Sequence, residues 1–139
     1  MAQTRILLVD DFQPWRVATA RILGAVPDFQ IVGEASNGVE AIEKAATLLP
    51  DIVLLDIGMP LLNGLEAART IRQASPESKI IFLTEQDDED VRSAALATGA
   101  DEYLVKSRTT QLSLEAADRR ACKESALSSR PPATLSSSA

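Results

Sequence analysis

The chain has 139 residues, of which 45% are apolar and 24% are charged, an ordinary composition for one folded domain. Its net charge is −6: residues 1–106 hold 17 acidic and 9 basic side chains (−8), and residues 107–139 hold 3 and 5 (+2). A domain this acidic lacks the basic surface that nucleic acids need, so we expect no direct binding to DNA or RNA. The absence of histidine excludes histidine-based hydrolase triads.

The expected location is the cytoplasm, without contact to a membrane. The N-terminal residues do not resemble a secretory signal, and no apolar run is long enough to span a bilayer. The single cysteine, Cys122, leaves no internal disulfide to form, which suits a reducing compartment.

Short apolar runs alternate with amphipathic stretches along the chain. The expected strands cover residues 5–9, 29–35, 52–55, 79–83 and 102–105. The expected helices run from about 14 to 25, from 37–38 to 50, from 63 to 75, and from 87 or 88 to about 98. Continuous apolar runs of this length are typical of parallel strands buried on both faces. The pattern therefore predicts a doubly wound α/β fold, in which a five-stranded parallel sheet carries helices on both faces.

Beyond Lys106 the pattern is weaker. Residues 109–127 are compatible with a fifth helix, although its apolar stripe is thin. The segment that follows is rich in serine and proline and has no face to bury, which is typical of disorder. We expect one domain over residues 4–124 and a disordered tail over 125–139.

Four of the expected strands end on polar residues. These residues are Asp10 and Asp11, Asp56, Thr84, and Lys106. Ligands of open parallel sheets bind outside the carboxyl ends of the strands, so the fold would gather these side chains in one crevice. Three carboxylates so close together repel one another, and a hard divalent cation such as Mg2+ relieves the repulsion. The pattern predicts a site for Mg2+ and a phosphoryl group, with the lysine supplying a further positive charge.

The same residues carry a resemblance to a known family. The motifs are Ile6-Leu-Leu-Val-Asp-Asp11, Leu54-Leu-Asp-Ile-Gly-Met-Pro60 with Asn63-Gly64, Leu83-Thr84, and Gly99-Ala-Asp-Glu-Tyr-Leu-Val-Lys106. Over residues 4–106 the chain resembles the receiver domain of two-component response regulators, a CheY-like member of the flavodoxin-like folds. Residues 31–38 resemble the receivers of regulators that carry a LuxR-type helix-turn-helix output domain.

The resemblance implies a role for each residue of the site. Asp56 would be the nucleophile and phosphoacceptor. Mg2+ would be held by Asp10, Asp11, Asp56 and the backbone carbonyl of Gly58. Thr84 and Lys106 would bind the phosphoryl oxygens, and Tyr103 would act with Thr84 as a switch that turns inward on phosphorylation. The phosphoryl donor would be a partner histidine kinase or phosphotransfer protein, because this chain has no histidine of its own.

Two further residues near the motifs are open to more than one interpretation. Glu85 stands where the family usually has a small residue, and we expect it beside the phosphoryl group. There its carboxylate would obstruct the hydrolytic water and prolong the phosphorylated state; the alternative is that it orients that water or slows the approach of an anionic donor. Trp15 falls in the first helical turn after the acidic pair, where it either packs into the core or senses the site.

Two functions of different class fit the sequence. In the first, the chain is a single-domain response regulator that accepts a phosphoryl group on Asp56 and signals to a downstream protein, without acting as an enzyme on other substrates. In the second, it is a receiver-like interaction module that works without phosphorylation. A Mg2+-dependent phosphohydrolase is a weaker third option, because no additional acid or base follows a strand.

Overall fold

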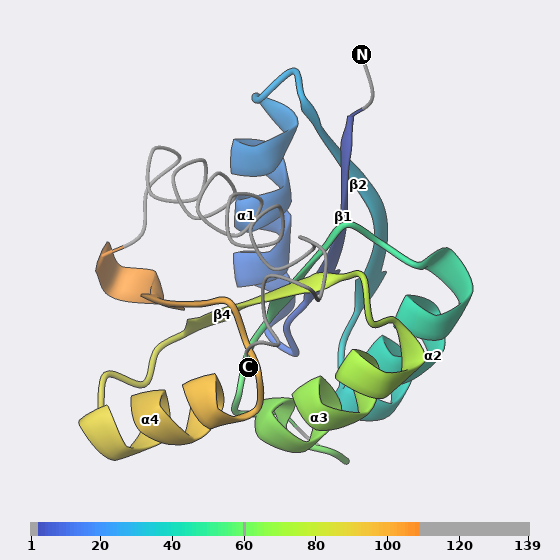
Figure 1. Cartoon of the computed structure of the whole chain (residues 1–139). Helices are drawn as coiled ribbons and strands as arrows, with labels where there is room; N and C mark the ends of the chain where they lie inside the picture. The colour runs from blue at the N-terminus through green and yellow to red at the C-terminus, as the bar shows by residue number, and fades with distance from the viewer. Residues whose placement is uncertain (1–2, 60, 109–139) are drawn as a thin grey trace, which may run out of the picture.

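The computed structural model describes residues 3–59 and 61–108 (Figure 1). The strands are β1 (Thr4–Val9), β2 (Phe29–Ala35), β3 (Ile52–Leu55), β4 (Lys79–Thr84) and β5 (Glu102–Val105). The helices are α1 (Gln13–Gly24), α2 (Gly38–Leu48), α3 (Gly64–Ala74) and α4 (Glu89–Ala97), and a 3₁₀ turn covers Lys106–Arg108. Every strand pairing is parallel, in the order β2-β1-β3-β4-β5, which confirms the predicted fold class. The predicted fifth helix, the domain boundary at 124 and the tail over 125–139 lie outside the described residues.

The sheet separates two layers of helix. Helix α1 covers one face, whereas α2, α3 and α4 cover the other (Figure 1). Alternate residues of each strand point to opposite faces, so Ile6 and Leu8 of β1 pack towards α1, and Leu7 and Val9 pack towards α2 and α3. The second layer rests on small side chains, which allow its helices to approach the sheet closely. These are Ala41, Ala45, Ala67, Ala68 and Ala95.

Three of the four helices in the described residues begin at side chains that cap their free N–H groups. The Asn37 side chain accepts a hydrogen bond from the Glu40 N–H at 2.8 Å, and the Asn63 side chain accepts one from the Glu66 N–H at 3.0 Å. Asp88 caps α4 in the same way. Helix α1 has no side-chain cap and instead has proline in its first turn, where the missing N–H has no helical partner to lose.

The pairing of β1 with β2 contains one irregularity. Ile6 lies opposite Ile31, but the next residue, Leu7, lies opposite Gly33, so that Val32 is an extra residue on β2. This is a β-bulge, and β2 is an edge strand of the described sheet.

Because all the pairings are parallel, the carboxyl ends of β1, β3, β4 and β5 lie at a single edge of the sheet. Within residues 3–59 and 61–108, none of the helices has both the length and the apolar character needed to cross a membrane.

Candidate functional site

The polar residues predicted from the strand ends meet at this edge. Asp10 and Asp11 follow β1, and Asp56 follows β3. One carboxylate oxygen from each of the three lies within 4.8 Å of the others. Asp10 and Asp56 are buried, whereas Asp11 is exposed. We refer to these three residues as the acidic cluster.

Backbone hydrogen bonds fix the two buried carboxylates. The Phe12 N–H donates to Oδ1 of Asp10 at 2.9 Å, and the Ile57 N–H donates to Oδ1 of Asp56 at 2.8 Å. The main chain of Asp56 is itself held by a 3.1 Å bond from its N–H to the carbonyl of Val9. In both carboxylates the second oxygen, Oδ2, is therefore directed towards a positive charge.

Lys106 supplies that positive charge. Its Nζ lies 2.6 Å from Oδ2 of Asp10 and 3.5 Å from Oδ2 of Asp56. Its side chain is only 5% exposed, so the ion pair is shielded from water. The indole ring of Trp15 lies on another side of the ammonium group, with 5.1 Å between Nζ and the ring centroid. Trp15 is half-buried and also contacts the apolar cluster beneath α1, so both interpretations of this residue have a structural basis.

The environment of Asp56 favours its uncharged form. Burial raises the pKa of its carboxyl above 3.8, and the nearby charge of Asp10 adds to the increase. The charge of Lys106 and hydrogen bonds from Thr84 and the Ile57 N–H lower that pKa and offset part of the effect. A carboxylate in this position gains from any additional cation placed near it.

Gly64 brings the start of α3 against the acidic cluster. A Cβ atom on Gly64 would lie 2.0 Å from the carbonyl oxygen of Asp56, closer than real atoms approach. The Gly64 N–H also donates to the carbonyl of Ile57 at 2.8 Å. This contact shapes the loop after β3, in which Gly58 is exposed beside the cluster.

Thr84 and Tyr103 are joined through Gln86. The Thr84 side chain is buried, and its Oγ1 accepts a hydrogen bond from the Gln86 N–H at 3.4 Å. The Tyr103 hydroxyl donates to the Gln86 carbonyl at 2.5 Å. Tyr103 is 5% exposed and has the guanidinium of Arg92 over its ring at 5.4 Å. The side chain expected to turn inward therefore already points inward in this structure, and its role as a switch stays a prediction.

Gln86 is the residue that the sequence reasoning missed. Its Nε2 would lie 3.6 Å from a Cβ atom on Gly58, so its amide lies beside the loop after β3 that Gly58 belongs to. Glu85 and Gln86 are both exposed, and the modulating role expected of Glu85 stays a prediction. In the sequence, the one indication that Gln86 lies near the carboxyl end of the sheet is its position two residues beyond the end of β4. The acidic residues around it drew the interpretation to charge instead.

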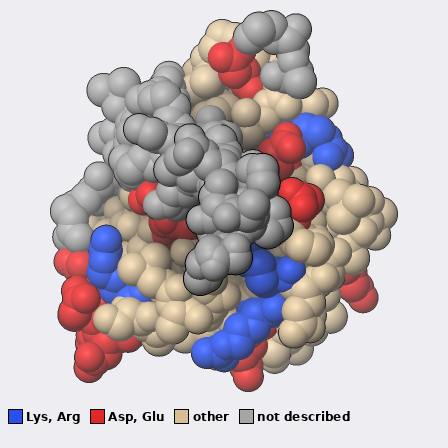
Figure 2. Space-filling model, in the orientation of Figure 1, with Lys and Arg blue, Asp and Glu red and all other residues tan. Residues whose placement is uncertain are grey.

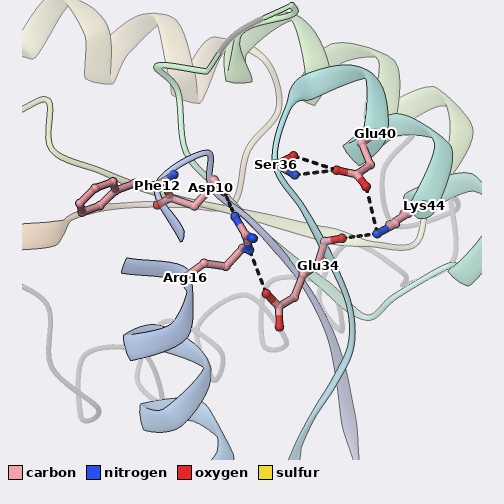
Figure 3. A network of polar contacts seen from close by, with 7 residues as sticks. All are labelled: Asp10, Phe12, Arg16, Glu34, Ser36, Glu40 and Lys44. Atoms are coloured by element: carbon pink, nitrogen blue, oxygen red, sulfur yellow. Dashed lines mark hydrogen bonds and ion pairs between the residues drawn. The ribbon is translucent and has the colours of Figure 1, made fainter. Parts of the chain in front are cut away.

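Arg16 connects the acidic cluster to the neighbouring elements (Figure 3). Its Nη1 donates to the carbonyl of Asp10 at 2.7 Å, and its Nε pairs with Glu34 on β2 at 2.9 Å. Lys44 on α2 continues the network, because it donates to the Glu34 carbonyl and pairs with Glu40 at 3.2 Å. The network ties the first turn of α1 to β2 and α2, and so limits the movement of Asp10.

The donor set suits Mg2+. All the ligands offered are hard oxygen atoms, and two of the three carboxylates are buried and oriented by backbone hydrogen bonds. Burial has raised the pKa of Asp56, as expected of a group that a cation would stabilise in its charged form. Further acidic side chains gather over α4 and the loop before it, at the lower left of Figure 2.

Comparison with known proteins gives concordant results. Residues 6–117 match the family model of the response regulator receiver domain. The chain is 39% identical over 123 residues to the nitrate/nitrite response regulator protein NarL of Escherichia coli K12, covering 88% of this chain and 57% of NarL. It is 38% identical over 112 residues to the transcriptional regulatory protein DegU of Brevibacillus brevis, covering 81% of this chain and 48% of DegU.

The structural comparison agrees with the sequence comparisons. The structure is similar to the response regulator domain of Thermotoga maritima CheB, with a TM-score of 0.80 and 31% identity, covering 87% of this chain and 97% of that one. The chain spans about half the length of the curated relatives, 57% of NarL and 48% of DegU.

Proposed function

Because this chain belongs to the response regulator receiver family, we propose that Asp56 accepts a phosphoryl group from a partner histidine kinase or phosphotransfer protein. The observation that carries the proposal is the meeting of the acidic cluster with Lys106 and Thr84 at one edge of the sheet. The chain would act as a cytoplasmic signalling module rather than as an enzyme on other substrates. It would contact a downstream protein, not nucleic acid.

The geometry supports in-line transfer to Asp56. Oδ1 of Asp56 is engaged by the Ile57 N–H, which leaves Oδ2 as the attacking oxygen. The new O–P bond forms as the P–N bond to the donor histidine breaks, and the electron pair stays on the imidazole nitrogen. Such transfer depends more on positioning and charge neutralisation than on acid–base catalysis. Lys106 and Thr84 would hold two phosphoryl oxygens.

Mg2+ is part of this proposal. Asp10, Asp11, Asp56 and the carbonyl of Gly58 would hold it, and it would neutralise charge between the carboxylate and the phosphoryl group. The Phe12 N–H and Arg16 keep Asp10 in place for that purpose.

Signalling would start from Thr84 and Tyr103. Both are hydrogen-bonded to Gln86, Thr84 through the N–H and Tyr103 through the carbonyl. Movement of Thr84 towards a phosphoryl oxygen would therefore change the loop that holds the tyrosine ring. That change would reach α4 through Arg92, which lies over the same ring.

Intact-mass analysis after incubation with acetyl phosphate and Mg2+ tests the proposal. We expect one labile phosphate adduct on the wild type and none on Asp56→Asn. The exposed Asp28→Asn serves as the control and should be phosphorylated like the wild type. An adduct on Asp56→Asn, or full phosphorylation in excess chelator, would contradict the assignment. A folded wild type that binds Mg2+ without an adduct would favour the interaction module instead.

A further inference from the structure

The environment of the Lys106 ammonium group includes an aromatic ring that the proposed chemistry does not use. Nζ of Lys106 lies 2.6 Å from Oδ2 of Asp10, and the Trp15 ring centroid lies 5.1 Å from the same nitrogen. A cation within about 6 Å of an indole face is attracted by the ring quadrupole, more strongly when water is excluded. The 5% exposure of Lys106 indicates that water is largely excluded here.

The ring is held in this position by its own helix. Trp15 lies in the first turn of α1, where the Arg16 N–H donates to the carbonyl of Phe12 at 3.0 Å. The side chain of Arg16 also donates to the carbonyl of Asp10 at 2.7 Å. The same turn therefore connects Trp15 to Asp10, so that the ring and the carboxylate contact the ammonium group as one fixed arrangement.

We propose that Trp15 is a positioning residue that holds the Lys106 ammonium against Asp10 and thereby sets the affinity of the acidic cluster for a divalent cation. The inference rests on the proposed function for the identity of the cluster as a cation site. Lys106 and a divalent cation both seek Oδ2 of Asp10, because Oδ1 is engaged by the Phe12 N–H. An aromatic ring that stabilises the ammonium at this oxygen therefore opposes the binding of the metal ion.

The test is isothermal titration calorimetry with Mg2+ alone, on the full chain at fixed ionic strength. Trp15→Leu keeps an apolar side chain but removes the aromatic face, and we expect it to bind Mg2+ about fivefold more tightly than the wild type. Trp15→Phe keeps a weaker aromatic face, and its affinity should fall between the two. Val17→Ala removes an exposed apolar side chain from the same helix and should leave the affinity unchanged.

A double-mutant cycle separates this role from simple packing. In a Lys106→Met background no ammonium group is present for the ring to hold, so Trp15→Leu should no longer change the affinity. An equal change in both backgrounds would overturn the proposal, because the ring would then act independently of Lys106. An unchanged or weaker affinity of Trp15→Leu in the wild-type background would also overturn it.

A second measurement decides the matter if Lys106→Met does not fold. The indole ring current should shift the Lys106 Hε signals upfield in the proton NMR spectrum of the wild type, and Trp15→Leu should abolish that shift. Unshifted wild-type signals would overturn the proposal. None of these measurements requires phosphorylation. If no phosphate adduct forms but Trp15 and Lys106 remain coupled in their effect on Mg2+ affinity, only the proposed function is contradicted. If the adduct forms but that coupling is absent, only this inference is contradicted.

Discussion

Asp56 is a carboxylate with little access to water, and its charge has consequences for stability. Its side chain is 10% exposed, and Asp10 brings a second negative charge close to it. Lys106 lies nearer to Asp10 than to Asp56, so neutralisation of Asp56 is incomplete. The charged form of Asp56, the proposed phosphoacceptor, is therefore destabilised in the folded chain.

We predict that Asp56→Asn raises the thermal unfolding temperature at neutral pH in the absence of divalent cations. The pKa of Asp56 is higher in the folded chain than in the unfolded one, so the native state binds the extra proton. Stability therefore falls as the pH rises through the folded pKa, and the destabilisation disappears below the unfolded value near 3.8. Scanning calorimetry at several pH values should show the gain at pH 7 shrinking towards pH 4. A gain that is the same at both pH values would show that the charge of Asp56 is not its cause.

Measurement of the dephosphorylation rate tests the roles of two neighbouring residues, Glu85 and Gln86. The sequence predicts that Glu85 lies near the phosphoryl group, and the structure also places the Gln86 amide beside Gly58. We predict that Gln86→Ala changes the dephosphorylation rate at saturating Mg2+ by about tenfold, which corresponds to about 1.4 kcal/mol in the barrier. If Glu85 obstructs the hydrolytic water, as expected from sequence, Glu85→Ala will lose its phosphate faster than the wild type. A large effect of Glu85→Ala with none of Gln86→Ala would refute the assignment to Gln86.

The location of the site could be predicted from sequence because each polar residue directly follows an apolar run. Parallel strands then bring Asp10, Asp56 and Lys106 to one edge, whatever the details of their side chains. The contacts of Trp15 and Gln86 could not be predicted in this way. They depend on rotamers and on the path of a loop, which hydrophobic periodicity does not describe.

At the scale of the elements, sequence signals located the strands and helices to within a few residues. Helix α3 begins after Asn63 as expected, because the asparagine side chain caps it. The sequence predicts α1 from about residue 14 to 25, and the helix spans Gln13–Gly24, a shift of one residue in a helix without a side-chain cap. The close approach of α3 to the strand that precedes it is a tertiary contact, and local propensity does not encode it.

That approach makes Gly64 sensitive to the smallest substitution. We predict that Gly64→Ala destabilises the fold by about 1–3 kcal/mol, because its Cβ would meet the carbonyl oxygen of Asp56 and force the backbone to move. Gly24→Ala is the matched control, since a Cβ there has no neighbour within 4 Å and alanine favours a helix by up to about 1 kcal/mol. Urea unfolding of both variants should give opposite signs, and a neutral Gly64→Ala would contradict the packing described.

At the scale of the whole molecule, occupation of the acidic cluster by a cation should stabilise the fold. A ligand that binds only the native state adds about 2.7 kcal/mol at a concentration of about 100 times its Kd. We predict that Mg2+ raises the unfolding temperature of the wild type in a concentration-dependent way. Asp11→Asn should lose most of this gain and yet unfold like the wild type without Mg2+, because Asp11 is the exposed member of the cluster. An equal gain in the variant would show that Mg2+ acts elsewhere.

The extra residue in β2 bears on the solubility of the chain. An edge strand offers unpaired backbone groups to other chains, and a bulge twists such an edge away from a flat template. Val32 interrupts the regular pairing at the β2 edge, so strands from other molecules find a poor match there. Deletion of Val32 should restore a regular edge, and we expect this variant to form thioflavin-positive fibrils sooner than the wild type. The bulge is therefore expected to slow the growth of amyloid from this edge.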